Sequence, residues 1–402
     1  MDAPLPPTLL GGARLVEPSG TRRASLRIED GRVAADRPPD GEELVVGLAG
    51  HLVFPGLVNA HDHLGLNAFP VADVGGPRRS AYDWIDALQP ALASERYAAV
   101  KRIDESVRAR HGGLKNLLSG VTTVAHHDPW IDAMGRADFP VRVVQPYGWC
   151  HSLRLAGRYG PAVEEALAAT PAGARFFLHL AEGVDEEAAG ELARLERLGG
   201  LGPATVLVHG VGLSPADVAE VVARGAGVAW CPASNRRVLG VTLDPRPLLA
   251  GGRLALGTDS RLSGAFDLLE ELRVARLSAA LPGADLLRLV TTDAARLLGV
   301  ADAGHLGPGA RADFVVLPDV DGDPREALAG FPRACLRAVV LAGAPRVADP
   351  DLLPWLEAAG VPARHARLDG APKVVDARLF TDEASALEPG FALAAGPVSC
   401  GS

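Results

Sequence analysis

Three shortages in the sequence each exclude a class of protein. The chain of 402 residues has 40 Lys and Arg against 49 Asp and Glu, a net charge of −9, so it lacks the basic surplus that binding to a nucleic-acid backbone requires. Its cysteines lie far apart, whereas disulfide scaffolds and zinc fingers need closely spaced pairs. We therefore interpret all four as free thiols in a reducing compartment: Cys150, Cys231, Cys335 and Cys400.

Long apolar segments are also missing. No run of about 18 apolar residues occurs, and residues 1–4 do not begin a basic region followed by an apolar segment, as a secretory signal would. We therefore expect a soluble, cytoplasmic protein. The composition, 48% hydrophobic and 22% charged, is that of an ordinary globular protein, and the length suits one large domain with a small one.

Both ends of the sequence are typical of antiparallel β-structure. Short apolar segments separated by turn residues occupy 13–46, where Asp30-Gly31 is a hairpin signal. The same pattern returns at 312–317 and 338–343. Neither end has enough strands to bury a core alone. We therefore expect residues 1–52 and 304–402 to fold together into a small composite β-sandwich domain.

The central part, residues 53–303, alternates short apolar runs with helical periodicity, which predicts βα units around a parallel sheet. Helices are predicted over 161–169 and 184–198, and another from Ser214, which is followed by Pro215. The predicted fold class is thus α/β, a (β/α)8 TIM-type barrel. Seven strands are predicted at 57–61, 121–125, 141–145, 175–180, 205–209, 227–231 and 253–258, and the eighth can only lie within 147–154.

Histidine and aspartate residues fall where a barrel would place an active site. His61 and His63 are two apart on a predicted strand, so their side chains point to the same face. His179, His209 and Asp259 each close or directly follow a later strand. The carboxyl ends of barrel strands converge on one rim, and imidazoles with a carboxylate suit Zn²⁺ or Fe²⁺. An isolated His-X-His would as readily be a hydrogen-bonded pair, but the whole set indicates a metal site.

Glu182 follows His179 by three residues, just beyond the predicted strand. A carboxylate in that place can take a proton from a metal-activated water and pass it to a leaving group. The alternative is a glutamate that stabilises a helix N-terminus, a role that Glu186 or Glu187 could equally fill. The position of Glu182 relative to His179 favours catalysis.

These residues belong to a series of motifs that resembles the amidohydrolase superfamily, from about residue 50 to residue 320. The motifs are Pro-Gly-Leu-Val-Asn-Ala-His-Asp-His at 55–63, Gly-Val-Thr-Thr-Val at 120–124, His-Leu-Ala-Glu at 179–182, His209, Cys-Pro-Ala-Ser-Asn at 231–235, Gly-Thr-Asp-Ser at 257–260 and Leu-Gly-Pro-Gly-Ala-Arg-Ala-Asp at 306–313. Their order makes the resemblance specific. The chain is most similar to the branch of cytosine and guanine deaminases and chlorohydrolase-like triazine hydrolases.

The resemblance implies one divalent metal ion, Zn²⁺ in the first place, with Fe²⁺ and Mn²⁺ as alternatives. The ligands it implies are His61, His63, His179 and Asp259. The catalytic residues it implies are Glu182, His209, which would face the attacked carbon, and Asp259 itself. Members with two ions usually bridge them with a carboxylated lysine on the fourth strand, and none of the three lysines here lies at a strand end in that region.

Residues just beyond the strand ends are candidates for substrate binding, because aromatic and a few polar groups suit a flat heterocycle in an apolar pocket. The predicted set is Trp84, Gln145, Trp149, His151, Arg154 and Asn235. Each of them could instead be a packing or rim residue. His126 and His127 are alternatives as extra metal ligands, disfavoured because adjacent residues on a strand face opposite ways.

The implied function is hydrolytic deamination of an amino-substituted nitrogen heterocycle by a metal-activated water. A hydrolase of amides or cyclic amides, or a dechlorinase-like enzyme that displaces another leaving group, would use the same site. A non-catalytic barrel scaffold is the alternative of a different class, and it would be indicated by lost ligand residues, of which the sequence shows none. We expect a small-molecule substrate, neither nucleic acid nor membrane as partner, and a homo-oligomer, a dimer in the simplest case.

Overall fold

The computed structural model describes residues 5–394 except 36, 38–40 and 42. Cys150, Cys231 and Cys335 are free thiols, as predicted, and Cys400 lies outside the described residues. Within the described part, every helix falls short of the length and apolarity that a membrane crossing needs.

Eight parallel strands form the α/β part of the molecule. They are β8 (Leu57–Asp62), β9 (Val121–His126), β10 (Arg142–Val143), β11 (Tyr147–Ser152), β12 (Arg175–Leu180), β13 (Thr205–His209), β14 (Gly227–Trp230) and β15 (Leu254–Leu256). They form a three-stranded sheet, order β10-β9-β8, and a five-stranded sheet, order β11-β12-β13-β14-β15. The N–H of Asp259, after β15, donates to the carbonyl of His61 on β8 at 3.1 Å. The first and last strands are therefore neighbours, as in a barrel, and the predicted fold class is confirmed.

The eighth strand lies where the sequence left room for it, within 147–154, as β11. However, β10 and β15 are shorter than predicted, and only residues 144–146 separate β10 from β11. A crossover between parallel neighbours needs about a dozen residues, so β10 and β11 do not pair, and the two sheets separate here. The helix α4 (Val163–Ala169) then follows β11, close to its predicted range.

The helices that follow the strands begin at recognisable caps. In α6 (Pro215–Ala223), Ser214 Oγ accepts a hydrogen bond from Asp217 N at 3.2 Å and Ser214 N donates to Asp217 Oδ2 at 2.9 Å, the predicted capping arrangement. α5 (Glu186–Arg197) begins after Asp185, which caps it. The other helices of this part are α1 (Ala81–Leu92), α2 (Glu95–Lys101), α3 (Glu105–Leu117), α7 (Pro232–Leu239), α8 (Arg246–Ala250), α9 (Leu268–Ala279), α10 (Gly283–Leu289) and α11 (Thr292–Leu298).

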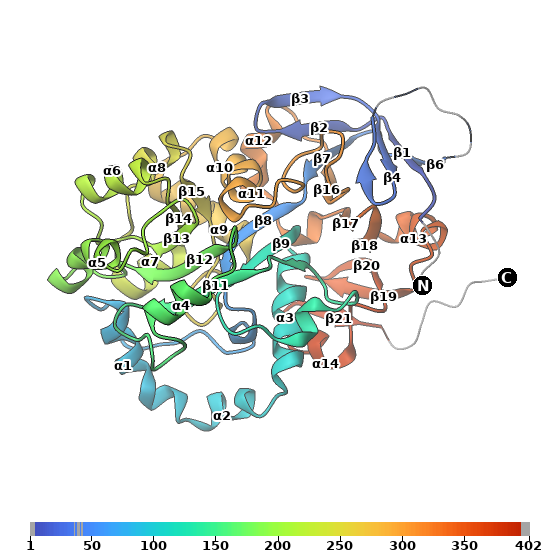
Figure 1. Ribbon diagram of the computed structural model, residues 1–402. Coiled ribbons are helices and arrows are strands. Elements are labelled where there is room, and N and C mark those ends of the chain that lie inside the picture. The colour runs from blue at the N-terminus through green and yellow to red at the C-terminus, as the bar shows by residue number, and fades with distance from the viewer. Residues whose placement is uncertain (1–4, 36, 38–40, 42, 395–402) are drawn as a thin grey trace.

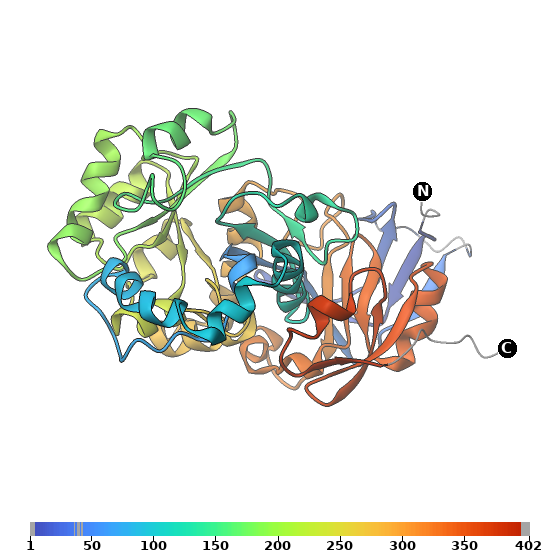
Figure 2. The ribbon, with the colours of Figure 1, turned by 90° about the horizontal axis from the view of Figure 1, so that it is seen from below.

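Strands from both ends of the chain share one sheet. It contains β2 (Arg14–Glu17), β3 (Gly20–Arg23), β7 (His51–Pro55), β16 (Phe314–Pro318), β17 (Ala338–Leu341), β18 (Ala344–Ala348), β19 (Ala363–Leu368), β20 (Ala371–Asp376) and β21 (Phe391–Leu393). Blue and orange to red ribbons lie side by side at the right of Figures 1 and 2. The join is the antiparallel pairing of β7 with β16, which places Phe314 opposite Pro55.

A second, smaller sheet packs against this one. Its strands are β1 (Thr8–Gly11), β4 (Leu26–Glu29), β5 (Arg32–Val33) and β6 (Leu44–Gly47), in the order β5-β4-β1-β6. The predicted hairpin is present, since Asp30 and Gly31 join β4 to β5 with φ of 50° and 72°. Leu10 and Leu26 are buried in one apolar cluster with Phe314 and Val340. The two ends of the chain thus build one composite β unit, as expected, which also includes α12 (Pro324–Ala327), α13 (Leu353–Ala358) and α14 (Asp382–Ser385).

A buried carboxylate ties the C-terminal segment to the barrel. Glu388 is 3% exposed and accepts hydrogen bonds from both terminal nitrogens of Arg261 at 2.8 Å and from His111 Nε2 at 3.0 Å, and it contacts Arg333. Burial alone would raise its pKa, but the hydrogen bonds from His111 and Arg261 hold the pKa of Glu388 well below its ordinary value. Arg261 follows Asp259 by two residues, so Glu388 also anchors the loop that carries Asp259.

Glu388→Gln is expected to lower the free energy of unfolding by about 3–5 kcal/mol near neutral pH, because it leaves buried guanidinium groups without their carboxylate. A carboxyl group with a depressed folded-state pKa contributes stability above its unfolded-state pKa, about 4.3, and loses it as the pH falls below that value. Urea unfolding should therefore show the difference between parent and variant shrinking below about pH 4.

Asp382→Asn is the matched control, because it removes a partner of Arg364 that is 80% exposed. It should change the stability by less than about 1 kcal/mol. Equal losses in the two variants would contradict the role of Glu388 as a buried anchor.

Candidate active site

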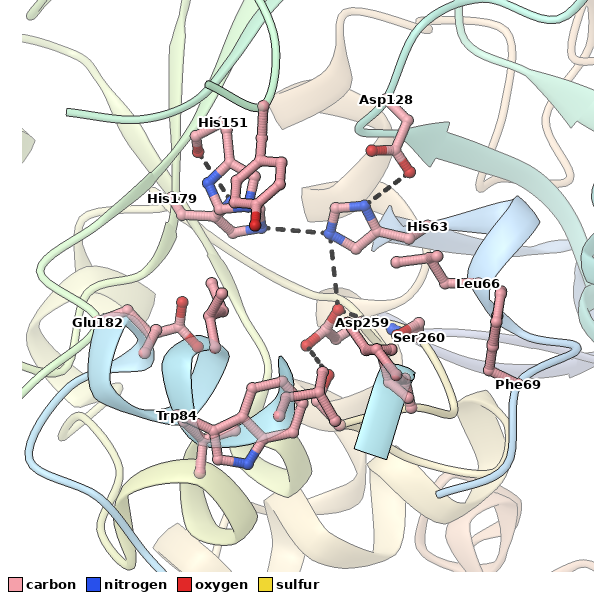
Figure 3. Close-up of a pocket in the computed structure, with 18 of the residues that line it drawn as sticks. His63, Leu66, Phe69, Trp84, Asp128, His151, His179, Glu182, Asp259 and Ser260 are labelled. Atoms are coloured by element: carbon pink, nitrogen blue, oxygen red, sulfur yellow. Dashed lines mark hydrogen bonds and ion pairs between the residues drawn. The ribbon is translucent and has the colours of Figure 1, made fainter. Parts of the chain in front are cut away.

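The carboxyl ends of the strands bring the predicted metal ligands together at one end of a cavity (Figure 3). His61 lies on β8 and His63 just beyond it, His179 lies on β12, His209 ends β13 and Asp259 follows β15. All five are buried, with exposed fractions of 7% or less. The strand-end positions read from the sequence therefore converge in space.

The distances between the donor atoms suit a single ion. Nε2 of His63 lies 3.2 Å from Nε2 of His179. Oδ1 of Asp259 lies 3.8 Å from Nε2 of His61 and 3.7 Å from Nε2 of His63. Metal–nitrogen bonds of about 2.1 Å in a tetrahedral site put neighbouring donors about 3.4 Å apart. The three measured distances lie close to that spacing, so these donors suit one divalent cation.

His61 gives the clearest sign that a ligand belongs here. Its side chain is fully buried, yet neither ring nitrogen has a hydrogen-bond partner among the described residues. Burial, reinforced by His63 and His127, lowers the pKa of His61 well below its ordinary value, so the ring is neutral. Buried polar groups in folded proteins nearly always have partners. A neutral imidazole with a free lone pair fits a metal ion.

Hydrogen bonds on the far side of two rings hold them in the orientation that a metal requires. His63 Nδ1 donates to Asp128 Oδ2 at 2.9 Å, and His179 Nδ1 donates to the carbonyl of His151 at 2.8 Å. Both Nε2 atoms are thereby left to face the cluster. Burial alone would lower the pKa of His63, but Asp128 and Asp259 raise it to about 9. Asp128 lies two residues beyond β9, and this position after a strand end is the only signal for it in the sequence.

Asp128→Asn is expected to weaken zinc binding about 10–100-fold, as loss of a carboxylate behind a metal-bound histidine usually does. Competition with a chromophoric chelator on the metal-stripped and reloaded protein measures this. Asp132→Asn, an exposed aspartate nearby, should leave the affinity unchanged. An unaltered affinity in Asp128→Asn would show that this hydrogen bond does not support a metal ligand.

A further histidine lies in the cluster. Donor atoms of His61, His63, His127 and His179 all lie within 4.8 Å of one another. His127 Nε2 donates to the carbonyl of Cys150 at 2.9 Å, and its Nδ1 has no partner among the described residues. His126 faces the other way, with Nδ1 accepting from the N–H of Leu64 at 3.3 Å. The alternation predicted for this pair is confirmed, and His127 is the member that faces the cluster.

The backbone at the strand ends is strained. Ala181, His209 and Asp259 have φ of 54°, 76° and 53°, in a region that side-chain-bearing residues rarely adopt. Such strain costs roughly 1–3 kcal/mol per residue and concentrates at functional sites. Here it aims the side chains of His209 and Asp259 towards the cluster.

Asp259 is held by hydroxyl groups on its other oxygen. Ser234 Oγ and Ser263 Oγ each donate to Oδ2 at 2.7 Å, which leaves Oδ1 towards the imidazoles. Burial raises the pKa of the Asp259 carboxyl, but His63, His209 and the two serine hydrogen bonds lower it below its ordinary value. Asp259 is thus a carboxylate, as a metal ligand must be.

Glu182 and His209 form the second functional pair. Glu182 Oε1 lies 3.5 Å from His209 Nε2. Burial, with Asp259 nearby, raises the pKa of Glu182 well above its ordinary value. His209 Nδ1 donates to Asn235 Oδ1 at 2.8 Å, which fixes the ring and directs Nε2 into the cavity. A raised pKa brings a carboxyl group closer to the range in which it can both accept and donate a proton, as general acid–base catalysis requires.

The cavity above the cluster has a volume of about 480 Å³, which is in the range of small-molecule sites. Of the predicted substrate-binding residues, Trp84, Trp149 and His151 line it. The other three lie elsewhere. Gln145 is exposed and lines a separate cavity, while Arg154 ion-pairs with Glu187 at 3.1 Å.

Asn235 is fully buried behind His209 and donates to Thr242 Oγ1 at 3.0 Å. Its position after the seventh strand correctly placed Asn235 near the active site, but Asn235 contacts His209 and not the cavity. The structure thus corrects the expected surroundings of Gln145, Arg154 and Asn235, because a position beyond a strand end does not fix the direction of the side chain.

Lys115 has no contact with the cavity. Its Nζ lies 3.0 Å from Asp62 Oδ2 and donates to Thr258 Oγ1 at 3.0 Å, and both side chains of the ion pair are fully buried. Asp62 separates His61 from His63 in the sequence, so the pair supports the strand that carries them. The sequence offered no signal for this long-range contact.

Comparisons with known proteins found similar sequences over much of the chain. Residues 162–345 match the Amidohydrolase family. The 5'-deoxyadenosine deaminase of Methanothermobacter thermautotrophicus is 29% identical, over 77% of this chain and 84% of the relative. The 8-oxoguanine deaminase of Pseudomonas aeruginosa is 27% identical, over 85% of this chain and 93% of the relative.

Solved structures share the fold. An adenosine deaminase from Xanthomonas campestris with bound zinc gives a TM-score of 0.66 at 20% identity, covering 86% of this chain and 94% of that one. The atrazine chlorohydrolase of Arthrobacter aurescens, complexed with zinc, gives a TM-score of 0.69 at 22% identity, covering 84% and 94%.

Proposed function

We propose that the chain, which matches the Amidohydrolase family over residues 162–345, is a mononuclear metal-dependent aminohydrolase that removes an amino group from a nitrogen heterocycle by hydrolysis. It is a hydrolase of carbon–nitrogen bonds other than peptide bonds. Relatives named as deaminases of 5'-deoxyadenosine and 8-oxoguanine support the reaction. The buried imidazoles beside Glu182 support the site.

We assign one divalent cation, zinc in the first instance, to His61, His63, His179 and Asp259. The unpartnered nitrogens of His61 and the donor spacing support the assignment. When bound, such an ion lowers the pKa of a coordinated water towards 7 and polarises the atom under attack. Asp128 and the carbonyl of His151 orient the imidazoles for it.

We assign the proton transfers to Glu182. Its carboxyl takes the proton of the attacking water and gives it to the nitrogen that leaves as ammonia. His209, held by Asn235, presents Nε2 beside Glu182 and stabilises the charge that develops on oxygen at the attacked carbon. The ring of the substrate would lie against Trp84 and Trp149, which line the same cavity.

One observation carries this proposal: His61 is fully buried and its ring nitrogens have no hydrogen-bond partner among the described residues, and it lies beside His63 and His179, which line the same cavity as Glu182, a glutamate whose pKa burial raises. A histidine that served only the core would be hydrogen-bonded. Together these histidines and Glu182 form a ligand set and a proton carrier around one point of attack.

A panel of aminopurines, aminopyrimidines and aminotriazines, with ammonia release as the readout, tests the proposed function. The zinc-loaded protein should release ammonia from at least one ring class, and the metal-stripped protein should regain this activity on reloading. Absence of ammonia from every member by zinc-replete protein would contradict the proposal. Turnover of cyclic amides instead would identify an amide hydrolase.

A further inference from the structure

The cavity has two unlike halves. The proposed metal ligands, with Glu182 and His209, lie at one end of the cavity, and α1 forms much of the other end. Residues of α1 at helical spacing line it, Ala81, Trp84, Ile85, Leu88 and Leu92. This spacing puts all five on one face of the helix, and Gln89, which is exposed, also lines the cavity from α1. Trp84 and Leu88 are buried, with exposed fractions of 6% and 4%.

Apolar side chains from other parts of the chain complete this half. Leu66 and Phe69 follow β8, Val238 lies on α7 and Leu262 lies in the loop after β15. In Figure 3, Trp84 lies below the cluster, on the side of Glu182, and Leu66 and Phe69 lie to the right of it, on the side of His63. Phe69, Trp84, Leu88, Val238 and Leu262 belong to one buried cluster. We call the cavity surface made by these residues and the α1 face the apolar half.

Charged groups of the lining are placed elsewhere. The carboxylates of Asp128 and Asp259 are hydrogen-bonded at the metal end, and Glu182 lies beside His209. Gln89 and Lys101 are exposed, and Lys101 Nζ already donates to the carbonyl of Leu92 at 3.1 Å. The described lining contains no arginine, and its carboxylates, Asp128, Glu182 and Asp259, lie at the metal end, so the polar lining residues on α1 and α2 are Gln89 and Lys101.

The volume and the apolar lining of the cavity favour an aliphatic substituent over one that carries hydroxyl groups. A volume of about 480 Å³ corresponds to roughly sixteen waters at ~30 Å³ each, more than a bare aminated ring fills. A hydroxyl buried there without a partner would reduce affinity roughly tenfold or more. Each buried methylene would raise it about fourfold.

We propose that the substrate is an amino-substituted heterocycle that carries an aliphatic substituent, seated in the apolar half, rather than a nucleoside or nucleotide. This inference rests on the proposed function. It sets the chain apart from relatives named as deaminases of 5'-deoxyadenosine, a nucleoside that carries a sugar. The ring lies over the metal cluster with its amino group towards Glu182, and the substituent extends along α1.

Matched compounds test the proposal: aminopurine, aminopyrimidine and aminotriazine rings that each carry methyl, ethyl, propyl, butyl or ribosyl at one ring position. With zinc-loaded protein, kcat/KM should rise about fourfold per methylene and the ribosyl compound should fall at least tenfold below the butyl compound. A flat series, or a ribosyl compound turned over best, would overturn this inference and leave the proposed function standing. No ammonia from any compound would overturn both.

A variant on the α1 face locates the substituent. Ile85 is half-buried and lines the cavity. Ile85→Asn should reduce the butyl-to-methyl ratio of kcat/KM about tenfold, while Ile85→Leu, which keeps the apolar surface, should retain it. The ratio is measured within one protein, so a general loss of activity does not affect it. An unchanged ratio in Ile85→Asn would place the substituent away from α1.

Discussion

The His179→Ala protein is expected to lose most of its metal and, with it, nearly all activity. His179 supplies Nε2 3.2 Å from that of His63, and without it three donors remain. The loss of affinity should exceed the 10–100-fold typical of partners that only hold a ligand in place. Elemental analysis of the purified parent should find about one equivalent of metal per chain, and that of the variant far less.

His61→Ala should behave in the same way, whereas His365→Ala, which removes an exposed histidine on β19, should retain the metal. Full retention by both His61→Ala and His179→Ala would contradict the ligand assignment. Two tightly bound equivalents in the parent would indicate a binuclear site, and His127, with its unpartnered Nδ1, would be the first residue to test as a ligand of the second ion.

The Glu182→Gln protein is expected to keep its metal and to lose about 10²–10⁴-fold in kcat, the usual contribution of a general acid–base group. The amide keeps the size and hydrogen-bonding capacity of the carboxyl but cannot accept and return a proton. Metal content and steady-state rates on the same preparation separate the two effects.

Two further variants serve as controls for the loss of kcat in Glu182→Gln. Glu187→Gln removes a partly exposed partner of Arg154 and should leave kcat near the parental value. Asp259→Asn should differ from Glu182→Gln, because it should lower the affinity for the metal as well as kcat. A zinc-loaded, folded Glu182→Gln protein that turned over at nearly the parental rate would show that the proton travels by another route, with Asp259 and His209 the first residues to test.

The group of proposed metal ligands could be predicted from the sequence because the fold determines where the strand ends meet. Strand ends that are far apart in the chain converge on one rim, so His61, His179 and Asp259 could be grouped before any coordinates. The side chains of His61 and His179, which lie on strands, also face inward for a local reason, the two-residue period of a strand. The composite β unit was predictable in the same way, since each end of the chain lacked the strands to fold alone.

Contacts between distant segments were not predictable. Nothing local to Glu388 indicates that it reaches Arg261, and nothing local to Lys115 indicates its pair with Asp62. Gln145 and Arg154 follow strand ends but turn away from the cavity, because loops set side-chain direction by packing. The separation of the sheets between β10 and β11 depends on the short link at 144–146, whose effect appears only in three dimensions.

The central claim is that the metal site and Glu182 catalyse the hydrolytic removal of an amino group. Labelling the product with oxygen from isotopically enriched water tests it most directly. The zinc-loaded protein is incubated in oxygen-18 water with whichever heterocyclic amine of the panel it accepts, and product and ammonia are quantified. The account predicts one solvent-derived oxygen at the carbon that bore the amino group and one ammonia per product. Product without the label, or label without an equivalent of ammonia, would contradict it.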